Sequence, residues 1–303
     1  ISQLRPILAL AYDESGSSTA FGLIRLLLVS GLLLLPATLM GMTFPLLGAY
    51  FERHSKKAGR MLALLYGINC SGAVLGALGA SFVLIPTLGL FGSTLATSLA
   101  NIFILISAMQ TEEAKTGASK ADSAPCKKQS HALDGLRAIH QGLLFVFALA
   151  GFASMVCQVA WTRVFSLLFG SSVYTFSIVL SAFIAGLALG SFLISKRLDT
   201  LRRPMALMAK LELGIALACF GITALMAWAP LAANLAYPSL IELPYSLICF
   251  IQFLSVSLLI LLPTTLMGML MPLVSHFLAK ESQEPGKAIG RVFASNTLGC
   301  IVG

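Results

Sequence analysis

The sequence PATLMGMTFPL at residues 36–46 recurs as PTTLMGMLMPL at residues 263–273. The offset of 227 residues continues beyond these segments without a gap, so that Asn69 is paired with Asn296. Because the offset covers the proline-containing segment and the segment that follows it, two consecutive structural elements are duplicated. The chain therefore contains an internal repeat.

The composition is that of an integral membrane protein. Apolar residues make up 57% of the chain and charged residues 11%, whereas soluble domains contain about 45–50% and about 25%. Only 12 acidic residues stand against 20 basic ones, which gives a net charge of +8. This balance excludes a soluble enzyme, a disordered protein and a nucleic-acid-binding protein, and it is explained by basic loops beside a lipid bilayer.

Long runs without Asp, Glu, Lys or Arg predict membrane-spanning helices. The run at residues 61–111 would form a helix of about 76 Å, more than twice the bilayer core of about 30 Å. It must therefore turn, and Pro86 and Gly89 are the expected breakers. We expect eight helices, near residues 21–50, 59–85, 89–109, 141–168, 172–195, 204–234, 246–279 and 286–303.

The predicted loops alternate in charge. Loops after the first, fifth and seventh helices are rich in Lys and Arg, whereas the loops between them contain neither. Residues 110–140 fall on the basic side and have the composition of a flexible linker. By the positive-inside rule, we expect the basic loops and this linker to be cytoplasmic and the protein to be a multi-pass protein of the cell (inner) membrane.

The offset decides the predicted architecture, because it pairs the first helix with the seventh and the second with the eighth. Matching helices six positions apart have the same orientation. The predicted fold is an all-α, polytopic transmembrane helical bundle with two parallel repeats of a six-helix unit, as in major-facilitator transporters. Residues 1–109 are the end of the first repeat, residues 110–140 the linker and residues 141–303 a truncated second repeat. About three helices are expected ahead of residue 1.

Several segments resemble the membrane-embedded spermidine synthase-like proteins. They are GFASMVCQVAWTR at residues 151–163, LFGSSVY at residues 168–174 and GLALG at residues 186–190. The resemblance implies a multi-spanning domain similar to the major facilitator superfamily, often followed by a soluble aminopropyltransferase domain that uses putrescine and decarboxylated S-adenosylmethionine. No catalytic motif lies within residues 1–303, so the chain itself is expected to hold neither catalytic residues nor a cofactor.

A second, looser resemblance concerns residues 190–199 with Arg202 and Arg203. They are similar to the facilitator loop that holds two helices together on the cytoplasmic side. The alternative is an ordinary positive-inside anchor.

The favoured function is that of a membrane domain of a spermidine synthase-like protein that binds or moves a polyamine-like or other small polar or cationic solute. Its expected partners are the lipid bilayer and a soluble aminopropyltransferase domain or another membrane protein. The alternatives are a stand-alone secondary transporter of the major-facilitator type with unknown substrate, and a scaffold subunit without transport.

Four polar residues within the predicted spans are candidate substrate-binding residues: Asn69, Asn296, Glu212 and Gln158. The two asparagines are expected near the membrane midplane, where repeat-built transporters bind their solutes; the alternative is a hydrogen bond between packed helices. Glu212 would lie about 12 Å deep, and a buried acid in a membrane marks a pathway or pairs with a cation. Gln158 matches a position that is usually acidic in the family it resembles. His and Cys spacing predicts no metal site.

Small residues four apart predict close helix packing. They form three sets: Gly72, Gly76 and Gly79; Gly186 and Gly190; Gly299 and Gly303. Trp161, next to Arg163, is expected in an interfacial belt.

Overall fold

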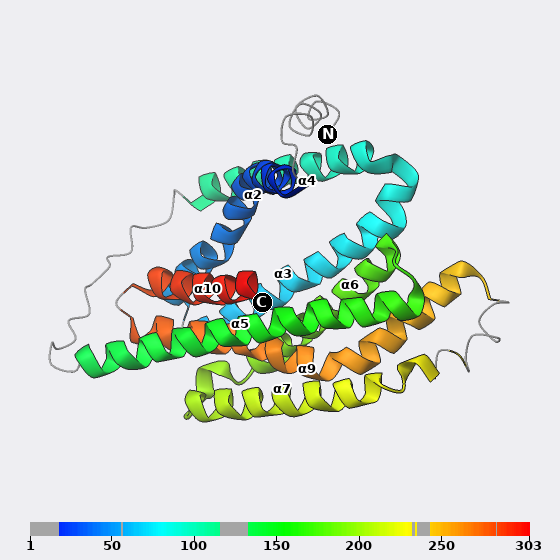
Figure 1. Cartoon of the computed structure of the whole chain (residues 1–303). Coiled ribbons are helices and arrows are strands. Elements are labelled where there is room, and N and C mark those ends of the chain that lie inside the picture. The colour runs from blue at the N-terminus through cyan, green and yellow to red at the C-terminus, as the bar shows by residue number, and fades with distance from the viewer. Residues whose placement is uncertain (1–17, 56, 116–132, 232–233, 235–242, 283) are drawn as a thin grey trace. The chain divides into compact units, whose positions relative to one another are not determined.

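The computed structural model describes residues 18–55, 57–115, 133–231, 234, 243–282 and 284–303. These ranges contain helices and no strand. The main helices are α2 (Ser18–His54), α3 (Ala58–Gly79), α4 (Ile85–Lys115), α5 (Leu133–Phe169), α6 (Val173–Ser195), α7 (Pro204–Met226), α9 (Tyr245–Glu281) and α10 (Pro285–Val302) (Figure 1). A π-helical turn, η2 (Ala80–Leu84), joins α3 to α4, and a 3₁₀ turn, η3 (Leu198–Thr200), lies between α6 and α7.

The all-α class and the membrane-spanning helices are confirmed. Six helical segments of the described chain are long and apolar enough to cross a membrane. The longest, Ala58–Met109, contains the predicted turn, because Gly89 has φ 67° and ψ −178° inside α4. Glycine adopts this positive φ without the steric cost of a β-carbon. Figure 1 shows the chain reversing direction between α3 and α4.

Two helices extend into the predicted linker. Helix α4 continues to Lys115 and α5 begins at Leu133, so residues 110–115 and 133–140 are helical. The sequence TEEAK at residues 111–115 consists largely of strong helix formers, which explains the longer α4. Residues 116–132, the rest of the linker, lie outside the described residues, as does most of the loop before α9.

The chain divides into two compact units, Ile1–Leu47 and Gly48–Gly303. The described part of the first unit is α2 up to Leu47, which stays helical through Pro36 and Pro45. In the second unit, α6 packs between α3 and α9, α7 packs on α9, and α10 packs on α5 and α9. This division into compact units does not test the boundaries predicted for the two repeats, which remain a prediction.

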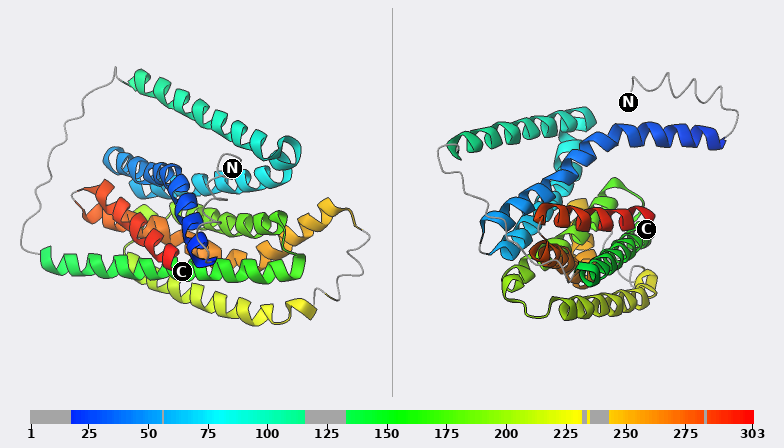
Figure 2. Two further views of the ribbon diagram at one scale, coloured as in Figure 1. Left: turned by 45° about the horizontal axis from the view of Figure 1, so that its top comes forward. Right: turned by 90° about the vertical axis from the view of Figure 1, so that its left-hand side faces the viewer.

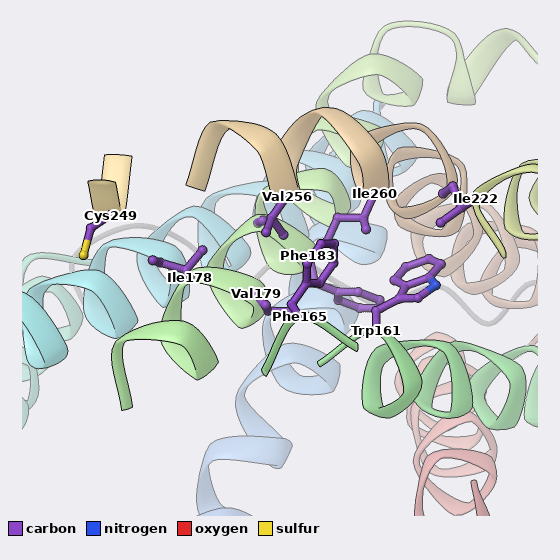
Figure 3. Packing of buried hydrophobic residues seen from close by; sticks show 10 residues of the cluster. Trp161, Phe165, Ile178, Val179, Phe183, Ile222, Cys249, Val256 and Ile260 are labelled. Carbon is purple, nitrogen blue, oxygen red and sulfur yellow. The ribbon is translucent and has the colours of Figure 1, made fainter. Parts of the chain in front are cut away.

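The apolar core of the second unit joins α5, α6, α7 and α9 (Figure 3). Trp161 and Phe165, one helical turn apart on α5, are 4% and 1% exposed and pack against Val179 and Phe183 of α6. The interfacial position expected for Trp161 is therefore wrong. Its spacing of four from Phe165 places both rings on one helix face, and that face is turned into the bundle.

Glycines set the close approach of α6 to α9. A β-carbon at Gly186 would overlap Thr264, and one at Gly190 would overlap the carbonyl oxygen of Thr265. Gly268 of α9 lies equally close to the backbone of Leu187. Small residues let membrane helices approach until their backbones are in contact, so the packing predicted for Gly186 and Gly190 is confirmed.

The other two glycine sets differ from each other. Gly299 and Gly303 of α10 lie against the backbone of α5, as predicted. For Gly72 and Gly76 of α3 the prediction fails within the described chain, since a β-carbon at either would meet nothing within 4 Å.

Contacts at matched positions agree with the repeat. A β-carbon at Gly59, at the start of α3, would lie 2.9 Å from the ring of His276 in α9. At Gly286, at the start of α10, it would lie 3.0 Å from the β-carbon of Ala49 in α2. The offset of 227 pairs Gly59 with Gly286 and Ala49 with His276. The same contact is thus made twice, with the helices exchanged.

Leu62 and Ile289 are a further pair at this offset. Both side chains are completely buried, and both reach Gly48, where a β-carbon would lie 2.9 Å from Leu62 and 3.0 Å from Ile289. Residues paired by the offset that lie beside the same residue are expected near a pseudo-twofold axis. Their position beside Gly48 agrees with a parallel arrangement of the two predicted repeats.

The α6–α9 contact yields a direct prediction. Replacement of Gly190 by Ala should lower the free energy of unfolding by about 1–3 kcal/mol, because the new methyl group has no room. Gly290→Ala is the matched control, since a β-carbon there meets nothing within 4 Å. That variant should be neutral or more stable by about 0.5–1 kcal/mol. Thermal unfolding in detergent measures both, and equal stability of the two variants would contradict the packing.

Candidate functional site

A polar cluster lies at one end of the second unit. It consists of the side chains of Glu52, Asp199 and His276 together with the backbone N–H groups of Gly59 and Arg60. Glu52 is near the end of α2, Asp199 lies in η3 and His276 lies in α9, while the two N–H groups belong to the first turn of α3. We call this set the polar end cluster.

His276 lies between two carboxylates. Its Nδ1 is 2.9 Å from Oε1 of Glu52, and its Nε2 is 3.9 Å from Oδ1 of Asp199. The side chains of His276, Glu52 and Asp199 are 12%, 10% and 24% exposed. An imidazolium ion would offer a donor to each carboxylate. Partial burial strengthens such charge-assisted contacts relative to the surface.

Asp199 also caps helix α3 from another part of the chain. Gly59 N donates to Oδ1 at 2.9 Å, and Arg60 N donates to Oδ2 at 3.1 Å. Lys57, at the N-cap position of α3, provides no side-chain hydrogen bond. The first N–H groups of a helix lack partners within the helix and carry the positive end of its dipole. Asp199 therefore accepts hydrogen bonds from two N–H groups of α3, and its negative charge also stabilises the positive end of the helix dipole.

Gly59 makes this approach sterically feasible. A β-carbon there would lie 2.8 Å from Oδ1 of Asp199 and 2.9 Å from the His276 ring. A larger residue would push the carboxylate and the imidazole away from α3. Among the described residues, no group of three His, Cys, Asp or Glu side chains has the geometry to hold a metal ion. The cluster is therefore a set of hydrogen bonds and ion contacts.

The cluster brings together the loops that follow α2, α6 and α9. These are the three short loops predicted to be basic, so their location at one end of the bundle is confirmed. The single acid of the loop after α6, Asp199, points inward to α3. The basic residues of this loop are exposed: Lys196, Arg197, Arg202 and Arg203. The assignment of this end to the cytoplasm remains a prediction.

Every hydrogen bond in the cluster joins the predicted first repeat to the predicted second, whereas the 3.9 Å contact of His276 with Asp199 lies within the second. Glu52, Gly59 and Arg60 belong to the first, and Asp199 and His276 to the second. The same boundary continues along α3 and α6, where Ser191 Oγ donates to the carbonyl oxygen of Ala63.

At the far end of this boundary, Ser81 and Ser177 share a buried hydrogen bond of 2.5 Å. Phe82 and Tyr174 are in ring contact beside it, with centroids 5.1 Å apart. The two predicted repeats are therefore in contact at both ends of α6, through α3 and η2.

None of the four predicted substrate-binding residues belongs to the polar end cluster. Gln158 is partly buried on α5, Glu212 is partly buried on α7, and Asn69 is exposed on α3. No hydrogen bond joins any two of the four side chains. One oxygen of Glu212, Oε1, is buried without a hydrogen-bond donor.

Asn296 lies in the contact between α10 and α5. A β-carbon at Gly151 of α5 would lie 2.7 Å from Oδ1 of Asn296, and the Asn296 amide donates weakly to the sulfur of Cys300 at 3.8 Å. This position favours the packing interpretation of Asn296. Asn69 and Asn296 are each the twelfth residue of their helix, so their matched register agrees with the repeat.

Sequence reasoning missed Glu52 and His276. Their partners at the offset of 227 are Ala279 and Ala49, so the polar pair occurs where the two repeats differ. Such a departure from the repeat is the signal that would have singled them out. Asp199 lies in the segment that resembles the facilitator loop, and its carboxylate accepts hydrogen bonds from the first turn of α3.

The chain matches no protein-family model, no curated protein and no solved structure. The function is therefore inferred from the residues and contacts above. The polar end cluster, the contact between α3 and α6, and the buried oxygen of Glu212 are the features with chemical consequences.

Proposed function

We propose that this chain is the membrane domain of a carrier for a small polar or cationic solute, in which the polar end cluster holds one end of the bundle closed. One observation carries the proposal. The contact of His276 with Glu52 and the contacts of Asp199 with Gly59 and Arg60 join one predicted repeat to the other. In repeat-built carriers, solute access alternates when one repeat rocks against the other.

The chemistry of the cluster suits a contact that must open and close. Its side chains are 10–24% exposed, so water can replace each partner when the repeats separate. A hydrogen bond exchanged for water has a net value of about 0.5–1.5 kcal/mol, and about 1.5–3 kcal/mol where a charge takes part. Several such bonds can hold a closed state without making it permanent.

Glu212 supports a polar or cationic solute. It lies in the apolar helix α7, and its Oε1 is buried without a donor. An ionised carboxylate in an apolar environment requires a cation, a proton or a hydrogen-bond donor. A cationic solute or a transported proton would supply the hydrogen-bond donor and the positive charge that Oε1 of Glu212 lacks.

The resemblance to spermidine synthase-like membrane proteins adds two points to the proposal. The solute would be a polyamine or a related amine, and an aminopropyltransferase domain outside residues 1–303 would produce or consume it. The basic loops around the polar end cluster would face the cytoplasm of a cell with an inner membrane. A stand-alone carrier would keep the same cluster and lack the catalytic domain.

The role of the cluster predicts an effect on access. Replacement of Asp199 by Asn, or of His276 by Ala, should weaken the closed state. A thiol introduced as Ala63→Cys should then be labelled from water about ten times faster. The reason is that a loss of about 1.4 kcal/mol in the stability of the closed state shifts the equilibrium between closed and open states tenfold. Ala63 is completely buried between α3 and α6. Glu284→Gln is the control, since this acid forms an exposed pair with Lys287 at 2.6 Å. Labelling that is equally slow in all variants would contradict the role.

The carrier function itself is tested by uptake into liposomes. The full-length protein should accumulate putrescine, and Glu212→Gln should reduce that uptake at least tenfold while the protein still inserts and keeps its melting temperature. The reason is that the amide removes the charge while keeping the size of the side chain. Absence of uptake by the wild-type protein would exclude a putrescine carrier, and unchanged uptake by Glu212→Gln would remove Glu212 from the pathway.

A further inference from the structure

One face of α3 has no neighbour among the described residues of the second unit, whereas the matching face of α10 is covered by α5. We call this the open α3 face and define it by five exposed residues that share a side of the helix: Ile68, Asn69, Gly72, Ala73 and Gly76. The contrast between the two faces indicates what covers α3.

Helix α10 holds α5 through polar contacts to its backbone. Ser295 Oγ donates to the carbonyl oxygen of Leu144 at 2.7 Å. Cys300 Sγ contacts the carbonyl oxygen of Gly151 at 3.5 Å. Both contacts require the two helix backbones to lie close together. Figure 2 shows the C-terminal end of α10 next to α5 in both views.

Two glycines of α10 make this distance possible. A β-carbon at Gly299 would overlap the carbonyl oxygen of Ala148, and one at Gly303 would lie 2.5 Å from the carbonyl oxygen of Phe152. With Asn296 against Gly151, five residues of α10 touch α5. They are Ser295, Asn296, Gly299, Cys300 and Gly303.

At the offset of 227, these five residues are paired with the five residues of the open α3 face. Each of these five residues that touch α5 therefore has an exposed counterpart on α3. Ile68 is 64% exposed, and a β-carbon at Gly72 or Gly76 would meet nothing within 4 Å. The surface that binds a helix in one repeat is present and empty in the other.

Asn69 adds a chemical reason for a partner. Its side chain makes no hydrogen bond to any described residue, and α3 is one of the apolar segments that can span a membrane. A polar amide in hydrocarbon costs several kcal/mol unless it is paired. Glycines facing lipid also gain nothing from burial, whereas glycines facing a helix permit backbone contact. The open α3 face is thus suited to a helix rather than to lipid.

We propose that a membrane-spanning helix equivalent to α5 packs on the open α3 face and belongs to the same polypeptide outside residues 1–303. The repeat identifies it, because the counterpart of α5 (Leu133–Phe169) at an offset of 227 falls ahead of Ile1. The α5 of a second copy is a poor candidate, since its binding face is already occupied by α10. This inference is independent of the polar end cluster and of carrier activity.

Glycine replacement in the full-length protein tests the proposal. Gly72→Leu should lower the melting temperature by roughly 5 °C or more, as should Gly299→Leu, whose β-carbon overlaps α5. Gly221→Leu on α7 is the control, because a β-carbon there meets nothing within 4 Å. It should leave the melting temperature unchanged or raise it. A Gly72→Leu variant that behaves like Gly221→Leu would overturn the proposal.

A crosslink identifies the occupant even if Gly72→Leu fails to fold. Ala73 is the counterpart of Cys300, which touches α5, so a photoreactive benzoylphenylalanine placed at Ala73 should capture the new helix. We expect a product with the mass of one polypeptide, in which peptide mapping joins α3 to a helix outside residues 1–303. A product of doubled mass, a crosslink to another protein or adducts with lipid alone would each overturn the assignment.

Discussion

The close approach of α6 to α9 is the constraint on which the rest of the structure depends. Gly186 and Gly190 on one helix and Gly268 on the other leave no room for a β-carbon. Without an aqueous hydrophobic effect between helices in lipid, backbone contact and polar bonds are the main sources of affinity. This contact fixes α6, and α6 in turn presents one side to α3. The junction between the two repeats is therefore built on a rigid pair of helices.

The junction itself has a different character. Along α3 and α6 it contains small and hydroxyl-bearing side chains, including the pair formed by Ser81 and Ser177. At one end it is completed by the polar end cluster, in which Asp199 caps α3 and His276 joins two carboxylates. Polar contacts of this kind can exchange with water, whereas the glycine contact between α6 and α9 cannot separate without exposing backbone. The structure thus combines a close glycine contact within the predicted second repeat with polar contacts between the predicted repeats.

The repeat and the alternation of loop charge predicted much of this fold. Charge-free runs located the helices, and Gly89, which was expected together with Pro86 to break the longest run, adopts a positive φ inside α4. The burial of Trp161 could not be predicted, because the face that a helix turns inward depends on its neighbours. The pair of Glu52 and His276 was missed for a related reason, since these residues are 224 positions apart. Only the fold brings them together.

The central claim is that α3 and α6 must separate at their junction for a solute to cross. Ala63 and Ser191 face each other there, with Ser191 Oγ bonded to the carbonyl oxygen of Ala63. The most direct test is a disulfide between Ala63→Cys and Ser191→Cys in full-length protein whose other cysteines are removed, with solute uptake into liposomes as the readout. The account predicts that oxidation stops uptake and that reduction restores it. Undiminished uptake by fully crosslinked protein would contradict the account.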